Sequence, residues 1–558
     1  MMETALQFAS SSADYYTFIS QSFDNEESII SKATGRFYTH QSICRTIAAS
    51  VIRLSTDLFT QQRISIIDPF CGDGRLVVAL LERLLSGSYL LPTTHIEVTL
   101  WDIDAKGVEI AEKAVNDLLS KQDRSFLVRT TIGDTFLEFA KSPARYDICV
   151  TNPPWCLLKP TNYSKFTRLS QETISRYEIV AEEYGNTLKR LFPSAMPAKT
   201  FGRWGINLSR CGLDACMSLL KEHGICGIVM PATLFSDQVS TALRKKLYEE
   251  NRIHEIHYYP AEVKLFGDAD QTSIAVVFSA GQVTTTFNIW DYSELGRLNP
   301  VVFGEKYQRY TIDNDYTIPF GYSLETIEIL SKLAKFPKLT EYPGLWIGRE
   351  IDETRISDRL VSQGKYAFKK GYMVNRYSCE DDLHRFLIED ITVPDTVMRP
   401  KIVWRDVSRA TQKRRIKATL LPEGTIAGNS LGVISLSSGS DNHLYWLLAL
   451  LNSYVVEFYA RRRLITNHVP AGVLRDISMP VLDESSEVDA SICQKAKAQI
   501  NNPQNVVRDA ELECLAAKVY GLTLEEFLSV LAVFKVSVDE EQLLRSTAEK
   551  VWQMGVLR

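Results

Sequence analysis

The chain has 558 residues, more than one hydrophobic core usually organises, so two or three domains are expected. Its 45% hydrophobic and 23% charged residues are typical of a globular protein, and no apolar stretch is long enough to span a membrane. A net charge of −5 argues against a globally basic nucleic-acid binder, although it leaves room for a local basic face. The N-terminus lacks the basic start and apolar run of a signal peptide, so a cytoplasmic location is expected.

Cysteine usage argues against a metal centre and against a disulfide framework. The ten cysteines are scattered along the chain without a Cys-x-x-Cys pair or a Cys/His cluster, and zinc sites usually depend on such clusters. We therefore expect free, mostly buried thiols and no bound metal. Cys71, Cys149 and Cys156 lie in or beside the motifs described below and are interpreted as packing residues.

The first predicted βα unit contains a glycine-rich loop flanked by acidic residues. Ile64 to Asp68 has the pattern of a buried strand, residues 69–74 form a tight loop, and Arg75 to Leu85 has helical spacing. The glycines let the backbone approach a ligand closely. Because Asp68 and Asp73 place carboxylates beside the helix N-terminus, the loop favours a ligand with a cationic portion over a phosphate.

Two further strands also end in acidic residues. Glu97 to Trp101 leads into Asp102, which can accept both hydroxyls of a ribose, and Val128 to Ile132 leads into Asp134, which suits an adenine amino group. Each acid could instead cap a helix, with roughly even odds for any one of them alone. Three successive acid-tipped strands are much less compatible with capping alone.

The fourth strand ends in a turn stiffened by proline. Tyr146 to Val150 reads as a buried strand, and Pro153 and Pro154 then prevent further ladder pairing. Asn152 and Trp155 are thereby held at the carboxyl end of a strand, where open α/β sheets bind ligands. Alone, Asn-Pro-Pro-aromatic should occur by chance in about one chain in a hundred. The surrounding motifs must therefore decide its meaning.

The remaining elements of the first half predict a three-layer, mostly parallel α/β sheet. Between Trp155 and Trp204 the sequence is irregular, and basic residues alternate with aromatic ones, which suits a nucleic-acid-facing loop, although a solvated insertion is the commoner explanation. The other predicted elements are a helix at Gln41 to Leu54, a helix at Leu213 to Glu222, a strand at Ile225 to Met230, a helix at Val239 to Glu250 and strands at Ile253 to Tyr259 and Ser273 to Phe278.

The motifs and their order resemble those of S-adenosylmethionine-dependent amino-methyltransferases, specifically the gamma-class (TaqI-like) N6-adenine DNA methyltransferases of restriction-modification or phage-defence systems. Thr34 to Thr39 resembles the family's N-terminal motif, Asp68 to Gly74 its methionine-binding loop, and Asn152 to Trp155 its catalytic motif. This order, followed by a long C-terminal region, is the gamma arrangement. The resemblance covers almost the whole chain.

The resemblance implies a Rossmann-like, seven-stranded methyltransferase sheet with helices on both faces, followed by a C-terminal mixed α+β target-recognition domain. It also implies S-adenosyl-L-methionine as the cofactor. Trp155 departs from the family, which more often has Tyr or Phe there, and Gly87 to His95 lengthens the spacing between two motifs. The implied cofactor-binding residues are Tyr38, Thr39, Asp68, Pro69, Gly72, Asp73, Gly74, Asp102, Ile103, Asp134 and Thr135, and the implied catalytic residues are Asn152, Pro153, Pro154, Trp155 and Phe266.

The expected chemistry explains why these residue types are needed. The lone pair of adenine's exocyclic nitrogen is delocalised into the ring, and acceptors on both amino hydrogens, from the Asn152 side chain and the Pro153 carbonyl, favour a pyramidal, more nucleophilic nitrogen. Trp155 and Phe266 would stack on the base, which must be flipped out of the duplex. Methylation of cytosine C5 would instead need a nucleophilic cysteine, typically after a proline, and the chain has no Pro-Cys pair.

The C-terminal half contains a basic tract that predicts a DNA-binding face. Lys369 to Tyr372 and Arg399 to Arg405 begin this tract, which continues to Lys417. Between Arg399 and Lys417 its only acid is Asp406. Phosphate neutralisation by such a tract would make binding strongly salt-dependent. An exposed basic strand pair without a ligand is the alternative, with odds of about one in three. The predicted DNA-binding residues are Lys401, Arg405, Arg409, Arg414 and Arg415.

These inferences predict a catalytic domain at residues 1–295, a target-recognition domain at 296–482 and an acidic helical tail at 483–558. The expected function is site-specific N6-adenine methylation of double-stranded DNA by a monomer or dimer, with a separately encoded restriction endonuclease as a partner that the resemblance allows. Two alternatives remain, a methyltransferase acting on RNA or protein glutamine and a non-catalytic DNA-binding subunit of a defence complex.

Overall fold

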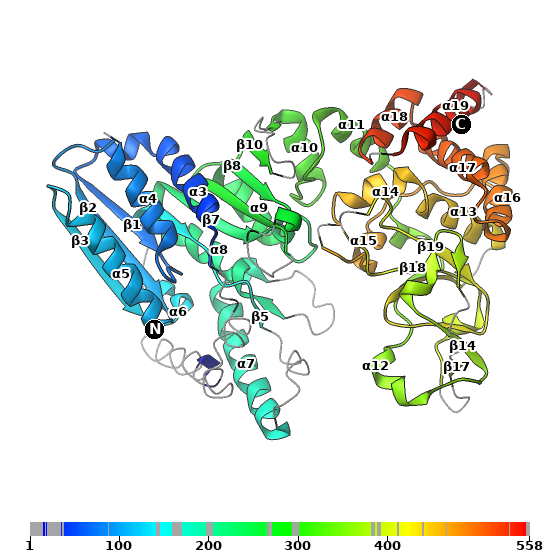
Figure 1. Ribbon diagram of the computed structural model, residues 1–558, viewed down its shortest axis with the longest axis horizontal. Helices are drawn as coiled ribbons and strands as arrows, with labels where there is room; N and C mark the ends of the chain where they lie inside the picture. Colours follow the sequence, from blue (N-terminus) through cyan, green and yellow to red (C-terminus); the bar gives the residue numbers. More distant parts are fainter. Residues whose placement is uncertain are drawn as a thin grey trace. The chain divides into compact units, whose positions relative to one another are not determined.

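The computed structural model divides the chain into two compact units, residues 1–320 and 321–558, which are described separately (Figure 1). None of the described helices combines the length and apolarity needed to cross a membrane. The structure describes residues 15, 16, 18, 35, 38–87, 89–140, 145–158, 170–196, 205–263, 265, 271–292, 301–380, 386–387, 392–409, 412–437, 440–464, 466–534 and 536–553.

The first unit is built on a nine-stranded sheet with the order β11-β10-β8-β9-β7-β4-β1-β2-β3 (Figure 1). Most neighbouring strands are parallel, whereas β9 runs antiparallel to β7 and β8, and β11 antiparallel to β10. The predicted seven strands are all present, and β10 and β11 extend the sheet by two. The strands are β1 (Arg63–Asp68), β2 (His95–Asp102), β3 (Phe126–Ile132), β4 (Tyr146–Thr151), β7 (Leu220–Pro231), β8 (Asn251–Tyr259), β9 (Ser273–Ala280), β10 (Phe287–Asp291) and β11 (Val301–Phe303).

Six described helices of the first unit contribute to two separate hydrophobic cores. One core combines the apolar faces of α3 (Gln41–Leu54), α4 (Arg75–Ser86) and α5 (Ala105–Leu119) with alternate strand residues such as Ile64 and Ile66. The other combines α6 (Thr135–Ala140), α7 (Gln171–Leu191) and α8 (Leu208–Leu219). The other α-helices with described bounds in this unit are α9 (Thr241–Glu250) and α10 (Glu305–Asp313). The predicted α/β fold is thus confirmed, with the sheet covered by helices.

The parallel register brings the acid-bearing strand ends to one edge of the sheet. Asp68 pairs with Leu100 across β1 and β2, and Asp102 pairs with Ile132 across β2 and β3. At the opposite ends of the strands, the buried carboxylate of Asp147 accepts hydrogen bonds from the Ser65 backbone N–H and the Lys221 ammonium, at 2.8 and 2.9 Å. These hydrogen bonds hold β4 against β1 and β7, so the sheet sets the position of the turn that follows β4.

The segment after the predicted catalytic turn, Asn152 to Trp155, differs from its prediction. Instead of an irregular loop, it contains the short antiparallel pair β5 (Leu157–Leu158) and β6 (Ile206–Asn207) and the 21-residue helix α7. Ser170 caps α7 by accepting from the backbone N–H of Thr173. The expectation of an irregular loop is wrong for α7, because its aromatic residues Tyr177 and Tyr184 form a buried helix face. Contact of this segment with nucleic acid stays a prediction. Residues 159–169 and 197–204 lie outside the described part of the chain.

The second unit combines two four-stranded sheets, ordered β12-β21-β18-β19 and β13-β17-β14-β20, with a layer of helices. Its strands are β12 (Leu345–Gly348), β13 (Leu360–Val361), β14 (Tyr366–Lys369), β15 (Val374–Asn375), β16 (Ser378–Cys379), β17 (Phe386–Leu387), β18 (Lys401–Arg405), β19 (Ala418–Leu421), β20 (Thr425–Ala427) and β21 (Leu431–Leu436). Its helices are α11 (Leu324–Leu333), α12 (Glu353–Ile356), α13 (Asp441–Leu451), α14 (Tyr454–Arg461), α15 (Ala471–Arg475), α16 (Glu487–Asn501), α17 (Val506–Val519), α18 (Leu524–Ala532) and α19 (Val538–Gln553).

The compact units divide the chain differently from the predicted domains. Strand β11 pairs with β10, so the sheet of the first unit continues past the predicted boundary at residue 295, and the division falls after Phe320. The tail is helical as predicted, but it belongs to the second unit. Glu513 on α17 forms salt bridges with Arg376 and Arg414, and α16 packs on α13.

Candidate functional site

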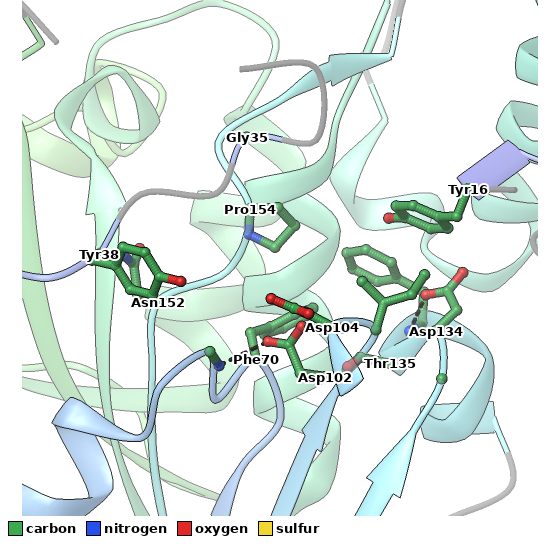
Figure 2. Close-up of a pocket in the computed structure, with 14 residues that line it drawn as sticks. Tyr16, Gly35, Tyr38, Phe70, Asp102, Asp104, Asp134, Thr135, Asn152 and Pro154 are labelled. Atoms are coloured by element: carbon green, nitrogen blue, oxygen red, sulfur yellow. Dashed lines mark hydrogen bonds between the residues drawn. The ribbon is translucent and has the colours of Figure 1, made fainter. Parts of the chain in front are cut away.

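A pocket opens at the carboxyl edge of the sheet in the first unit (Figure 2). Eight of the predicted site residues line it: Tyr38, Gly72, Asp102, Ile103, Asp134, Thr135, Asn152 and Pro154. The structure therefore brings six of the eleven predicted cofactor residues and two residues of the predicted catalytic turn together in one cavity. The other lining residues are Tyr16, Gly35, Phe70, Asp104, Gly133 and Phe136.

The glycine-rich loop is braced by the acid at the tip of β2. Asp102 accepts from the Gly72 backbone N–H through Oδ2 at 2.8 Å and from the Asp104 backbone N–H through Oδ1 at 2.9 Å. Gly74 has a φ of +82°, and a Cβ there would lie 2.8 Å from the Cβ of Ala111 on α5. Only glycine fits this left-handed, closely packed position. Asp104, the neighbouring acid, caps α5.

Asp68 lies beneath the loop and is not part of the pocket wall. Its side chain is 1% exposed, and Oδ1 accepts from the Thr151 hydroxyl at 2.7 Å and the Phe70 backbone N–H at 3.3 Å. Burial raises the pKa of this carboxyl to about 8. Its Oδ2 has no hydrogen-bond partner among the described residues. Asp68 thus joins the ends of β1 and β4 and supports the loop from below.

The acid at the tip of β3 both lines the pocket and caps a helix. Asp134 Oδ1 accepts from the Phe136 backbone N–H at 2.9 Å, and Oδ2 accepts from the Tyr184 hydroxyl at 2.8 Å. The adjacent Thr135 hydroxyl donates to the Pro69 carbonyl and so joins the start of α6 to the glycine-rich loop. The two interpretations of this acid, capping and ligand binding, are therefore compatible.

The N-terminal motif and the catalytic turn contact each other closely. The Trp155 backbone N–H donates to the Gly35 carbonyl at 3.1 Å. Gly35 has a φ of +71°, and a Cβ there would lie 2.7 Å from the backbone nitrogen of Cys156. From the other side, Gly212 of α8 approaches so closely that an added Cβ would lie 2.4 Å from a carbon of Pro153. The turn is thus held by backbone packing on both sides.

The amide of Asn152 is oriented by the N-terminal motif. Its Nδ2 donates to the Thr39 hydroxyl at 3.1 Å, which assigns the donor end of the amide. The neighbouring Tyr38 is 52% exposed. The Arg75 guanidinium lies over the Tyr38 ring, with its Cζ 4.7 Å from the ring centroid. Arg75 is held in turn by Asp73, whose Oδ2 accepts from Nε at 2.7 Å. Asp73 therefore acts through Arg75, outside the pocket lining.

Trp155 and Phe266 complete the predicted catalytic set. The Trp155 ring is partly buried against the first hydrophobic core, as is Leu265. Phe266 lies outside the described residues. The predicted stacking of both rings on a base remains a prediction.

The structure corrects the predicted DNA-binding tract. Lys401 is fully buried and pairs with the equally buried Glu350, with Nζ 2.5 Å from Oε1, and burial lowers the pKa of this lysine. Arg414 is 9% exposed, pairs with Glu513 and donates to the Asn452 carbonyl at 3.0 Å. These two cations neutralise buried acids, so their assignment to a DNA-facing surface is wrong.

Arg415 is also internal, whereas two other members of the tract reach solvent. Its side chain is 2% exposed, and Nη2 donates to the Ser408 and His468 carbonyls at 3.1 and 3.2 Å. Its guanidinium thus donates inward to backbone carbonyls of two neighbouring loops, and its assignment as a DNA contact is wrong too. Arg405 is half-buried and Arg409 exposed.

The structure also brings together three cysteines that lie far apart in the sequence. The thiols of Cys149, Cys216 and Cys226, from β4, α8 and β7, lie within 4.8 Å of one another and are buried. Only the pairing of Cys149 with Cys226 across β4 and β7 could have been inferred, from the strand register. Tyr184 was likewise missed, because its position inside an apparently irregular segment carried no motif.

Comparisons with known proteins agree with this architecture. The family described as N-6 DNA Methylase matches residues 11–183, which contain the glycine-rich loop and the catalytic turn. The Type IIL restriction-modification enzyme MmeI, solved in complex with DNA, is similar with a TM-score of 0.50 and 13% identity, over 97% of this chain and 78% of that chain. The ATP-dependent Type ISP enzyme LlaBIII, solved bound to DNA, gives a TM-score of 0.50 and 11% identity, over 87% of this chain and 40% of that chain.

The type IIG restriction endonuclease BpuSI is a third similar structure, with a TM-score of 0.40 and 13% identity, over 93% of this chain and 67% of that chain. At these identities the structural similarities to MmeI and LlaBIII show a shared fold. The family match covers the segment in which the predicted motifs lie. The first unit thus contains a segment that matches the N-6 DNA Methylase family, and the chain shares its fold with restriction-modification enzymes.

Proposed function

We propose that the protein transfers a methyl group from S-adenosylmethionine to N6 of an adenine flipped out of double-stranded DNA at a specific sequence. The observation that carries this proposal is the shared pocket, in which Asp102 and Asp134 at neighbouring strand tips face the same cavity as Asn152. Figure 2 shows Tyr38 and Asn152 on one side of this cavity and Asp134 on the other.

The chemistry of the lining residues suits S-adenosylmethionine. Asp102 would accept from the ribose hydroxyls and Asp134 from the adenine amino group, while Gly72 allows close approach of the backbone. Carboxylates at this edge would repel a phosphate but tolerate a ligand with amino and sulfonium groups. When bound, the cofactor supplies a methyl group activated by a positively charged sulfur.

The catalytic turn can activate an exocyclic amine. Because Asn152 donates to Thr39 through Nδ2, its Oδ1 is the acceptor end that would receive an amino hydrogen. The Pro153 carbonyl would receive the second hydrogen and so localise the lone pair on nitrogen. Trp155 and Phe266 would hold the base by stacking, which contributes about 1–3 kcal/mol per base. Proximity to the methyl donor then supplies much of the rate acceleration.

The second unit would supply DNA binding and sequence recognition. Among the predicted DNA-binding residues, exposed Arg409 and half-buried Arg405 are the ones that we propose contact phosphate. Both MmeI and LlaBIII were solved with DNA, which supports DNA as the substrate. A separately encoded restriction endonuclease and a monomeric or dimeric state remain part of this proposal.

The test is methyl transfer from labelled S-adenosylmethionine to unmethylated plasmid DNA, with RNA and a protein extract as competing substrates. We expect label in DNA only, and sequencing that detects modified bases should place it on adenine within one recurring sequence. Asn152→Ala is the inactive control. Label in RNA or protein, or on cytosine, would contradict the proposal, as would cofactor binding without transfer to any DNA.

A further inference from the structure

Helix α7 supports the pocket wall on the side of Asp134. Four of its residues, Tyr177, Ala181, Tyr184 and Leu188, are buried in the core that α7 shares with α6 and α8. Their spacing of three or four residues is that of one helix face. Among them, Tyr184 donates a hydrogen bond from its hydroxyl to Asp134, which lines the pocket.

The Tyr184 hydroxyl and the start of α6 hold the two oxygens of the Asp134 carboxylate separately. The hydroxyl donates to Oδ2 at 2.8 Å and the Phe136 backbone N–H to Oδ1 at 2.9 Å. Tyr184 is fully buried, and its burial, together with the nearby carboxylate, raises its pKa well above the ordinary value. The hydroxyl therefore keeps its proton near neutral pH, and Asp134 is held as an acceptor.

Tyr184 also supports the aromatic part of the same wall. Its ring meets the ring of Tyr16 edge-on, with centroids 5.9 Å apart and an interplanar angle of 69°, and it stacks on Tyr15 at 5.1 Å. Tyr16 lines the pocket and lies on the same side as Asp134 in Figure 2. An oriented acceptor beside an aromatic ring suits a flat heterocycle that carries a hydrogen-bond donor.

We propose that Tyr184 is a positioning residue that fixes Asp134 as the acceptor by which the cofactor pocket selects a 6-aminopurine over a 6-oxopurine. This inference rests on the proposed function, in which the pocket binds S-adenosylmethionine. A 6-amino group presents hydrogens to the carboxylate, whereas a 6-oxo group presents lone pairs that the carboxylate repels. If Oδ2 lost its partner on α7, the carboxylate would be less firmly oriented and the discrimination would fall.

The test compares the dissociation constants of S-adenosylhomocysteine and S-inosylhomocysteine, measured by calorimetry on the full chain. The ratio between the two is expected to favour the adenosyl compound at least about tenfold in the natural protein, as a hydrogen bond to a charged group allows. Tyr184→Phe keeps the ring and removes the hydroxyl, so the ratio should fall about three- to tenfold. Tyr177→Phe, on the same buried helix face, is the matched control and should leave the ratio unchanged.

Asp134→Asn shows whether Tyr184 acts through the carboxylate. The ratio should fall in this variant too, and adding Tyr184→Phe to it should change the ratio no further. Two results would overturn this inference while leaving the proposed function intact. They are an unchanged ratio in Tyr184→Phe, or an equal further fall when Tyr184→Phe is added to Asp134→Asn. Either would mean that Tyr184 contributes only packing. If the natural protein binds neither compound, the proposed function fails, and the inference fails with it.

Discussion

Charged side chains gather in two regions of this molecule, the carboxyl edge of the first unit's sheet and the tract around β18 and β19 of the second unit. At the sheet edge, Asp102 and Asp134 line a pocket, and each holds backbone N–H groups of the loop or helix beside it. In the tract, Lys401 and Arg414 turn inward to buried glutamates. The two acids line a pocket, whereas Lys401 and Arg414 hold the second unit together.

The difference follows from how each charge is placed. An acid directly after a parallel strand must lie at the carboxyl edge, because strand direction and register fix it there. A cation in a tract of mixed strands and loops has no such constraint, and a long Arg or Lys side chain reaches whichever acid or carbonyl the fold provides. A cluster of charged residues in the sequence therefore predicts a binding face only where the strand topology fixes which of their side chains are exposed.

Arg414→Ala should have the largest effect on stability. It leaves the buried Glu513 with one cation fewer, and breaking a buried pair costs about 3–5 kcal/mol. Urea unfolding of the full chain should show a matching fall for the second unit. Arg409→Ala replaces an exposed arginine of the same tract and should leave stability unchanged. If the two variants had equal free energies of unfolding, the buried Arg414 would contribute no more to stability than the exposed Arg409.

Asn152→Ala should lower methyl transfer by about 10²–10³-fold, the effect of removing one oriented hydrogen-bonding group at a reaction centre. Because Asn152 lies at the far side of the pocket from Asp134 (Figure 2), the dissociation constant of S-adenosylmethionine should stay within about twofold. Calorimetry and a filter-binding assay of transfer give the two values. Loss of cofactor binding would instead make Asn152 a structural residue.

Asp68 should make stability depend on pH. Its folded pKa of about 8 lies above the ordinary value of 3.8, so the folded state holds a proton that the unfolded state has lost, and stability should decline as pH rises from about 4 to 8. The contribution is at most about 1.4 kcal/mol per pH unit. Asp68→Asn should flatten this decline in denaturant unfolding at several pH values. The same slope in both proteins would show that Asp68 is ionised when folded.

Arg409→Ala should have the smallest effect. An arginine that neutralises one phosphate contributes about 0.9 to the slope of log affinity against log salt, so the variant should bind DNA slightly more weakly with a slope reduced by about that amount. Fluorescence anisotropy at several salt concentrations measures it. Lys413→Ala is a useful comparison, since Lys413 pairs with Glu540 and should change the slope less. An unchanged slope for Arg409→Ala would remove the last exposed arginine of the predicted set from the interface.

Much of the first unit was predictable because its signals are local. Alternation along β4, helical spacing in α4 and an acid after each of three strands depend on neighbouring residues, and the parallel topology then brings the strand tips together. Helix α7 was not predicted, since Tyr177 and Tyr184 sit among charged residues that mask the apolar face. The extension of the sheet by β10 and β11 was missed for a related reason, because short strands carry little periodicity.

The amino-acid order by itself determined the α/β class, the position of the turn from Asn152 to Trp155 and the acids at the sheet edge, because each depends on strand direction and on residues adjacent in the chain. Only the tertiary structure decided that Arg415 is internal, that Tyr184 holds Asp134 and that three cysteines meet. Those contacts join residues far apart in the chain. Which acid, carbonyl or thiol a side chain meets depends on how the elements pack, and no local pattern encodes it.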